Sequence, residues 1–305
     1  MTKKIIITGA TGFIGKKLSI RLTNEGNNVI VFTRNKETAK RRLPGMTDYI
    51  EWNPMNISTW IDNVDGTDAI INLAGENLFA KRWNNKHKKK IEQSRLITTR
   101  ALVNAIYHSK NKPQVFISAS AIGYYGFTGD AEVTEGAKPV NDFLANVTQK
   151  WELETADVES LGVRRVILRI GMVLDNNEGA LAKMLPAFRI FVGGPLGNGK
   201  QWFSWIHIND LVDMFLFALN NKNINGVYNA TAPNPVKMKV FAKSIGKVMH
   251  RPSIFPVPEF ALKIILGEGA KYITNGSKVL PLKILASGFK FKYENAEDAL
   301  ESLLK

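Results

Sequence analysis

Short runs of apolar and β-branched residues recur along the first two thirds of the chain, as is typical of buried strands. These runs predict strands at Lys4–Thr8, Asn28–Thr33, Tyr49–Trp52, Ala69–Leu73, Gln114–Ser118 and Arg165–Leu168. Longer segments with apolar residues at helical spacing predict helices at Ile14–Thr23, Lys86–Tyr107, Asp142–Ser160 and Leu211–Leu219, the last capped by Asp210. Alternating strands and helices predict an α/β protein with a doubly wound parallel sheet, a Rossmann fold.

The pattern changes near Pro233, where prolines begin to separate short apolar segments. Amphipathic helices are predicted at Met238–Met249 and Glu259–Leu266. We therefore expect two parts, a dinucleotide-binding Rossmann domain at 1–232 and a small, mainly helical C-terminal lobe at 233–305. Since ligands of such sheets bind at the carboxyl ends of the strands, the lobe is expected to cover that edge.

The 305 residues, 45% hydrophobic and 22% charged, are typical of a folded globular protein. The apolar stretches are much shorter than the ~20 residues that cross a bilayer. We expect no transmembrane helix, no membrane partner and no signal peptide. The absence of cysteine excludes disulfides and thiolate metal sites. These features together favour a cytoplasmic protein without a bound metal.

The net charge is +14, and its distribution is uneven. Residues 1–43 hold ten lysines and arginines against two glutamates, which makes the expected cofactor end electropositive. A second basic cluster spans Lys81–Lys90, and we interpret it as a solvated face. Neither region carries a recognisable nucleic-acid-binding module or interleaved aromatic residues. We therefore expect no nucleic-acid partner.

A glycine-rich segment follows the first predicted strand and opens the first predicted helix. Glycines at such a turn allow a tight bend and a close approach of the backbone to a pyrophosphate, which the helix N-terminus then faces. The segment predicts a dinucleotide site formed by Thr8, Gly9, Thr11, Gly12, Phe13, Ile14 and Gly15.

The end of the second strand indicates which dinucleotide is bound. An acidic residue there would bind the ribose 2′-hydroxyl of NAD, whereas a cation would bind the 2′-phosphate of NADP. This chain has Thr33 and Arg34 and no acid at that corner. Arg34 can pair with a phosphate and Thr33 can assist it, which favours NADP. The alternative is that Arg34 only begins a solvated loop.

The Gly-x-x-Gly-x-x-Gly spacing of Gly9, Gly12 and Gly15, with the motifs at 72–75, 205–211 and 226–229, resembles the extended short-chain dehydrogenase/reductases. Longer motifs narrow the resemblance; they lie at 72–77, 118–126, 150–152, 193–197 and 201–207. Together they are similar to the atypical "epimerase family" group, subfamily 39U, in which a C-terminal domain of unknown function follows the epimerase domain. The resemblance covers almost the whole chain.

The resemblance implies further cofactor contacts. Leu73, Ala74 and Gly75 would pass beside the adenine-side ribose, and Val173 would lie near the nicotinamide. Arg95, on the helix beside the fourth strand, would also contact the cofactor; a solvated position on the helix face is its alternative.

The catalytic residues depart from the family pattern. Ordinary members use a tyrosine and a lysine four residues later as the acid/base pair. The corresponding helix, 141–152, has no such pair. Ser120 stands where the superfamily's serine usually lies, and Tyr124 and Tyr125 follow it, so Ser120 and Tyr124 are the catalytic candidates. The alternative is that the tyrosines pack a glycine-rich turn.

Three other features have two interpretations each. His207 is either a second acid/base candidate or a structural hydrogen-bonding residue at the domain junction. The glycine-rich segment 193–200, with Lys200 and Gln201, either holds an anionic group or forms a tight turn. The aromatic residues Trp202, Phe203 and Trp205 line a substrate pocket or pack in the core.

Two functions from different classes fit this sequence. One is an NADP(H)-dependent oxidoreductase or nucleoside-diphosphate-sugar epimerase-like enzyme whose small-molecule substrate, anionic or not, is unidentified. The alternative is a non-catalytic NADP(H)-binding regulatory or scaffold protein. A monomer and a homodimer paired through the helices at Lys86–Tyr107 and Asp142–Ser160 both remain open.

Overall fold

The computed structural model describes residues 2–305 and contains a seven-stranded sheet in which every pairing is parallel. The strands, in the order β11-β7-β5-β4-β1-β2-β3, are β11 Gly226–Ala230, β7 Arg164–Ile170, β5 Val115–Ala121, β4 Ala69–Asn72, β1 Lys4–Thr8, β2 Asn28–Thr33 and β3 Asp48–Glu51. The predicted doubly wound sheet is confirmed, and the six predicted strands lie where the apolar runs placed them.

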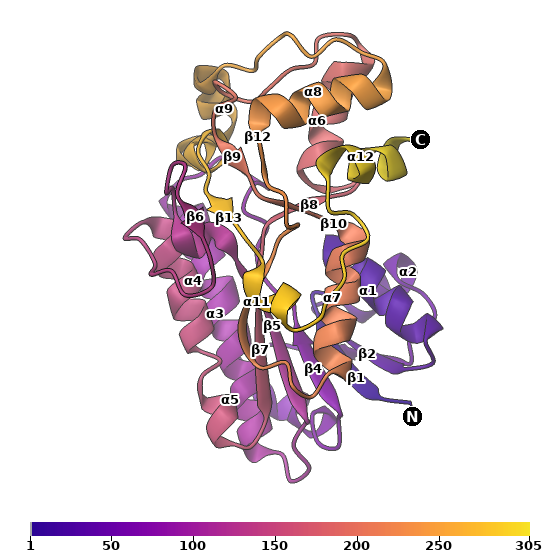
Figure 1. Cartoon of the computed structure of the whole chain (residues 1–305). Coiled ribbons are helices and arrows are strands. Elements are labelled where there is room, and N and C mark those ends of the chain that lie inside the picture. Colours follow the sequence, from indigo (N-terminus) through magenta and orange to yellow (C-terminus); the bar gives the residue numbers. More distant parts are fainter. Residues whose placement is uncertain (1) are drawn as a thin grey trace.

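Alternating residues of the strands face two separate cores. Ile5 and Ile7 of β1 pack in one core with residues of α1 (Phe13–Asn24), α2 (Lys36–Arg42) and α7 (Ile208–Asn220). Ile6 faces the other core, with residues of α3 (Asn85–His108) and α5 (Asp157–Ser160). Helices thus cover both faces of the sheet, as Figure 1 shows.

The prediction of one continuous helix at Asp142–Ser160 is wrong, because the segment forms two helices. Asp142 is the N-cap of α4 (Phe143–Leu153), and its carboxylate accepts a hydrogen bond from the backbone N–H of Ala145. The α-helical pattern stops after Glu154, because the backbone N–H groups of Thr155 and Ala156 bond to carbonyls three residues back, and Thr155 Oγ1 also donates to the carbonyl of Glu152. This tighter turn separates α4 from α5.

The predicted cap at Asp210 is also wrong. Helix α7 begins at Ile208 with His207 as its N-cap, because His207 Nδ1 accepts the backbone N–H of Asn209. The buried carboxylate of Asp210 instead accepts the backbone N–H groups of Lys292 and Tyr293. Asp210 therefore ties the C-terminal segment to the main sheet domain.

Short elements connect the main strands. They are β6 Glu132–Val133, β8 Met172–Leu174, β9 Trp202–Phe203, β10 Trp205–His207, helix α6 Gly179–Arg189 and the 3₁₀ turns η1 Ile57–Thr59, η2 Ile61–Asn63 and η3 Ile122–Tyr125. The predicted helices of the C-terminal region are present as α8 Met238–Met249 and α9 Glu259–Leu266. The other C-terminal elements are β12 Val236–Lys237, η4 Glu268–Ala270, α10 Lys271–Thr274, β13 Lys278–Val279, α11 Leu282–Ala286 and α12 Ala296–Leu304.

The C-terminal region is mainly helical but does not stand apart from the sheet. Phe289 and Phe291 lie in the same core as β1 and α7, and β13 pairs with β6. Lys88, in the basic cluster at the start of α3, pairs with Glu268 of this region at 2.8 Å. The predicted boundary at residue 232 thus divides two regions that share a core. Within residues 2–305, no helix combines the length and apolarity needed to cross a bilayer.

Candidate functional site

The predicted cofactor residues meet at one edge of the sheet. Thr8 of β1 is paired in register with Phe32 of β2 and with Asn72 of β4. The chain therefore leaves the sheet at nearly the same level after all three strands, at Gly9 and Leu73 and, one residue later, at Arg34. This is the carboxyl edge of a parallel sheet, where ligands of doubly wound folds bind.

A buried hydrogen-bonded cluster fixes the two central loops at this edge. Thr8 Oγ1 donates to Asn72 Oδ1 at 2.8 Å and accepts the backbone N–H groups of Leu73 and Ala74 at 3.2 Å. Asn72 Nδ2 donates to Thr99 Oγ1 of α3 at 2.9 Å. Thr8, Leu73 and Ala74, all predicted as cofactor contacts, thus hold the loops after β1 and β4 against each other.

Two glycines are required by close backbone approaches. Gly9 has φ +68°, and a Cβ there would lie 2.7 Å from the carbonyl oxygen of Leu73. A Cβ at Gly15 would lie 2.3 Å from the carbonyl oxygen of Gly9. Both distances are too short for a side chain, so the glycines bring loop, strand and helix together.

The N-terminus of α1 is open to an anion. Gly12 is its N-cap with extended backbone and no side chain to bond the first turn, which contains no acidic residue. Among the described residues, no acceptor bonds the backbone N–H groups of Phe13, Ile14 and Gly15. Thr11 lies in the turn just before this N-cap. These free donors at a helix N-terminus fit the pyrophosphate of a dinucleotide.

The corner after β2 presents an unpaired cation. Arg34 is exposed and forms no ion pair with any residue from 2 to 305. The neighbouring turn does not use it, because Asn35 caps α2 through its own side chain and Thr33 Oγ1 bonds the backbone of Asn35. The guanidinium of Arg34 is therefore available to bind a phosphate near the N-terminus of α1.

Arg95 is held against the loop after β4 and is not a solvated residue of the helix face. Its Nη1 donates to the carbonyl oxygens of Ile91 and Glu76 at 2.9 and 3.2 Å, and its guanidinium lies 5.1 Å from the ring of Trp151. Burial lowers the pKa of Arg95 to about 10, so it is still cationic at neutral pH. A Cβ at Gly75 would lie 3.2 Å from its Cζ, which places this cation beside the predicted cofactor segment.

Val173 lies outside the large sheet, in β8, which pairs with β10. A Cβ at Gly179 would lie 3.1 Å from the carbonyl oxygen of Val173 and 3.0 Å from the ring of Phe13. The backbone of Val173 is thereby brought near the start of α1, on the side expected for the nicotinamide.

Ser120 takes part in a buried ion-pair network. Its hydroxyl donates to Glu152 Oε1 of α4 at 2.6 Å. Both oxygens of Glu152 also accept from Arg169 of β7, from Nε at 2.8 Å and from Nη2 at 2.7 Å. The Arg169 side chain is only 5% exposed and that of Glu152 11%. Burial disfavours the charge, but the hydrogen bonds and charge of Glu152 outweigh it and raise the pKa of Arg169.

The network continues across the sheet to the C-terminal region. Arg169 Nη1 donates to the Tyr125 hydroxyl at 2.9 Å, which donates to Asn229 Oδ1 at 2.7 Å. Asn229 Nδ2 donates to the carbonyl of Leu280. The sheet register places Ser120, Arg169 and Asn229 opposite one another on β5, β7 and β11. One polar row thus connects the candidate serine to the region after residue 232.

The two neighbouring tyrosines have different roles. Tyr125 is buried, its hydroxyl is fully engaged, and burial raises its pKa despite Arg169, so it is structural. Tyr124 stacks its ring on Arg169, with 3.4 Å between Cζ and the ring centroid. In the part of the chain that the structure describes, the Tyr124 hydroxyl makes no hydrogen bond. Tyr124 therefore remains the phenol that is free to act.

His207 is built into the domain junction. Since its Nδ1 accepts the N–H of Asn209, the proton of the neutral ring lies on Nε2, which faces Ser302 Oγ at 3.2 Å. The ring also packs on Tyr293, with centroids 3.9 Å apart. Burial, with the nearby charges of Lys17 and Lys292, lowers the pKa of His207 to about 4 despite Asp175. This environment supports the structural interpretation.

The pKa of His207 predicts acid sensitivity. A histidine near 6.5 when unfolded and about 4 when folded binds its proton more tightly in the unfolded state, so stability falls as pH drops from 6.5 to 4. The expected contribution is about 3 kcal/mol. His207→Asn, which keeps an N-cap acceptor, should flatten the pH dependence of urea unfolding in this window. His108→Asn, an exposed control, should leave it unchanged; equal slopes for wild type and His207→Asn would contradict the assignment.

The glycine-rich segment 193–200 packs against the C-terminal region, as the turn interpretation requires. Phe255 N–H bonds Gly193 O, and the backbones of Pro195 and Gly197 exchange hydrogen bonds with Val257. Gln201 Nε2 donates to Leu196 O and Ile273 O. Of the nearby aromatics, Phe203 and Trp205 are buried in a core with α8, while Trp202 Nε1 bonds Asp130 at 2.7 Å.

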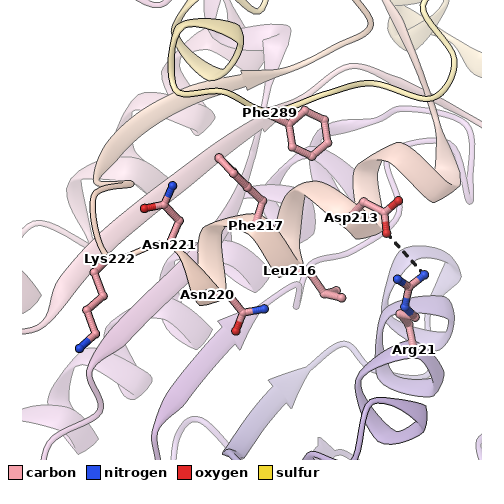
Figure 2. A pocket seen from close by; sticks show the side chains of 8 residues that line it. All are labelled: Arg21, Asp213, Leu216, Phe217, Asn220, Asn221, Lys222 and Phe289. Carbon is pink, nitrogen blue, oxygen red and sulfur yellow. Dashed lines mark ion pairs between the residues drawn. The ribbon is translucent and has the colours of Figure 1, made fainter. Parts of the chain in front are cut away.

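A surface groove between α1 and α7 is shown in Figure 2. Its lining residues are Arg21, Asp213, Leu216, Phe217, Asn220, Asn221, Lys222 and Phe289. It lies near the amino ends of the strands, since Arg164 at the start of β7 bonds the carbonyl of Ala218. None of the predicted site residues lines it, so the carboxyl edge is the candidate site.

Sequence reasoning missed three members of the network: Glu152, Arg169 and Asn229. A usable signal existed at Arg169, which follows the apolar run Val166–Leu168 directly. Charged residues are almost never fully buried without a partner, so an arginine on a central strand implies a buried acid.

Known proteins resemble this chain along its whole length. Residues 5–231 match the NAD dependent epimerase/dehydratase family, and 257–303 match a domain of unknown function, DUF1731. The epimerase family protein SDR39U1 homolog, chloroplastic, of Arabidopsis thaliana is 43% identical, with 99% of this chain and 86% of that protein covered. The epimerase family protein YfhF of Bacillus subtilis is 40% identical, covering 98% and 97%. A crystal structure of human SDR39U1 (isoform 2) with NADPH is 31% identical, covers 98% of both chains and has a TM-score of 0.87.

Proposed function

We propose that this chain, which belongs to the NAD dependent epimerase/dehydratase family, is an NADPH-binding, epimerase-like oxidoreductase. The observation that carries the proposal is the unpaired guanidinium of Arg34 beside the open N-terminus of α1. The human SDR39U1 structure, whose title names NADPH, supports it. We also propose a small-molecule substrate, a cytoplasmic location and no nucleic-acid partner.

Different elements of the site would bind different parts of the dinucleotide. The first-turn N–H groups of α1 would bind the pyrophosphate, and Arg34 with Thr33 would bind the 2′-phosphate. Arg95 and the segment Leu73–Gly75 would bound the cofactor on the β4 side. When bound, a nicotinamide supplies hydride transfer to or from a carbon of the substrate.

The polar network defines what Ser120 offers to a substrate. The single proton of Ser120 is donated to Glu152, whose carboxylate also accepts two hydrogen bonds from Arg169, so the free lone pairs of Ser120 Oγ are acceptors. We propose that Ser120 accepts a hydrogen bond from a substrate hydroxyl and that Tyr124 is the proton donor. Ser120, near the end of β5, and Tyr124, in η3, both lie at the carboxyl edge of the sheet.

A non-catalytic NADPH-binding protein is the second candidate. It is favoured by the helix α4, which has no tyrosine–lysine pair, and by the commitment of the Ser120 proton to Glu152. The two candidates differ in one result: an enzyme oxidises NADPH with some substrate and loses turnover in Ser120→Ala. A binding protein shows tight NADPH affinity and no turnover with any substrate.

Arg34→Ala tests the cofactor assignment. Loss of a charge-assisted phosphate contact should weaken NADPH binding by about 10- to 100-fold and leave NADH affinity unchanged. Calorimetry at one fixed salt concentration measures both affinities. Arg42→Ala, which removes the same charge at the far end of α2, should affect neither. Equal NADPH affinities in wild type and Arg34→Ala would contradict the proposed site.

A further inference from the structure

Two loops at one end of the molecule expose large apolar side chains. Ile190, Phe191 and Val192 follow α6 and are 69%, 53% and 47% exposed, and Ile254 and Phe255 follow α8 at 71% and 50%. The loops lie side by side, because the N–H of Phe255 donates to the carbonyl of Gly193. Figure 1 places α6, α8 and α9 together at the end of the molecule farthest from α5.

Helix α9 extends this apolar surface along the chain. It begins four residues after Phe255, and only Leu262 of its eight residues is buried. Phe260 and Ile264, one helical turn apart, are 67% and 68% exposed. Exposed apolar groups gathered in three neighbouring segments mark an interaction surface.

Phe191 occupies a backbone conformation that favours glycine. Its φ is +67°, at the C-terminus of α6, where its N–H donates to the carbonyl of Phe188 and the N–H of Val192 donates to that of Ala187. Glycine usually fills this position because a side chain costs stability there. The chain nonetheless has an exposed phenylalanine here, which the fold itself does not require.

The two loops themselves carry charges of one sign, and Glu259, at the start of α9, is paired with Lys263. Residues 179–209 and 233–258, which include both loops, contain lysines and arginines but no aspartate or glutamate. Arg189 is exposed directly before Ile190, and the guanidinium of Arg251 lies 4.4 Å from the ring of Phe191. Apolar tips surrounded by cations are complementary to a surface with an apolar interior and anionic headgroups.

We propose that this end of the molecule docks on an anionic lipid bilayer, with Phe191 and Phe255 inserted at interfacial depth. Arg189 and Arg251 then contact the headgroups. The inference departs from the expectation of no membrane partner, which rested on the shortness of the apolar segments. The length of single apolar segments does not reveal a surface that several short segments form together. The membrane proposal is independent of the proposed function, since no predicted cofactor residue lies in these loops.

Vesicle sedimentation of the full chain tests the proposal. Binding is expected to vesicles of equal parts phosphatidylcholine and phosphatidylglycerol, to weaken with added salt, and to be much weaker on phosphatidylcholine alone. The double substitution Phe191→Gly with Phe255→Ser should reduce partitioning about tenfold or more. Leu153→Ser, which removes an exposed apolar side chain of α4, should not.

Two further measurements make the test decisive. Phe191→Gly should melt at the same or a higher temperature, because glycine relieves the left-handed backbone, and NADPH affinity should not change. Absence of wild-type binding to the anionic vesicles, or unchanged binding of the double variant, would overturn the proposal. A dimer in light scattering that Phe191→Gly dissociates would overturn it in favour of a second copy as the occupant.

Discussion

Glu152→Gln is expected to lower the free energy of unfolding by about 3 kcal/mol or more, because it leaves the guanidinium of Arg169 buried without its counter-ion. The substitution preserves the size of the side chain and removes its charge. In the wild type, both carboxylate oxygens bond Arg169 and one also accepts the Ser120 hydroxyl. Urea unfolding followed by circular dichroism measures the loss.

Glu154 provides a matched control two residues along the chain. It also binds an arginine through two hydrogen bonds, from Arg100 Nε and Nη2, but that arginine side chain is 68% exposed. Glu154→Gln should therefore cost less than about 1 kcal/mol. Equal effects of the two substitutions would show that the Glu152–Arg169 pair does not stabilise the fold as described.

Gly15→Ala is the second large expected effect. The added Cβ would lie 2.3 Å from the carbonyl oxygen of Gly9 and 2.7 Å from Ala10 Cα, and backbone atoms cannot move as easily as a side chain. We expect a loss of about 1–3 kcal/mol in unfolding free energy from overpacking. NADPH affinity should fall more than about tenfold, because α1, whose first-turn N–H groups would bind the pyrophosphate, must shift away from the loop after β1.

Gly136→Ala is the control for that substitution, since a Cβ there meets no atom within 4 Å and its φ is not positive. It should change neither stability nor NADPH affinity measurably. A Gly15→Ala protein with wild-type affinity by calorimetry would mean that the close packing of α1 on the loop does not shape the site.

The parts of the site that could be predicted from the sequence are local. Residues 8–15 combine a strand end, a glycine-rich turn and a helix start within eight positions, so their geometry follows from neighbouring residues. Arg34 could be predicted for the same reason, because it directly follows the adjacent strand. The sheet and these loops therefore follow from local sequence patterns.

The network around Ser120 could not be predicted in the same way. Glu152 lies 32 residues after Ser120 and 17 before Arg169, and Tyr125 and Asn229 are 104 residues apart. Their contacts depend on the register of β5, β7 and β11 and on the side of α4 that faces the sheet. Periodicity predicts the elements but not these pairings.

The errors at helix ends have a similar origin. The apolar pattern of 142–160 continues across Thr155, whose side chain bonds the carbonyl of Glu152 where the helix stops. Asp210 suits an N-cap by residue type, yet its carboxylate bonds the backbone at 292–293, far along the chain. In both cases the preference of the residue type for a helical or capping position did not predict the hydrogen bond that its side chain makes.

Whether the 2′-phosphate of NADP is bound beside Arg34 can be measured by ³¹P nuclear magnetic resonance of that phosphate. The dianion of a free phosphate monoester takes up one proton near pH 6. A phosphate held by a guanidinium should remain dianionic to lower pH, so its titration midpoint is expected to fall on binding to the wild type. In Arg34→Ala the midpoint should return toward that of free NADP. An unchanged midpoint in the saturated wild-type complex would show that Arg34 does not hold the 2′-phosphate.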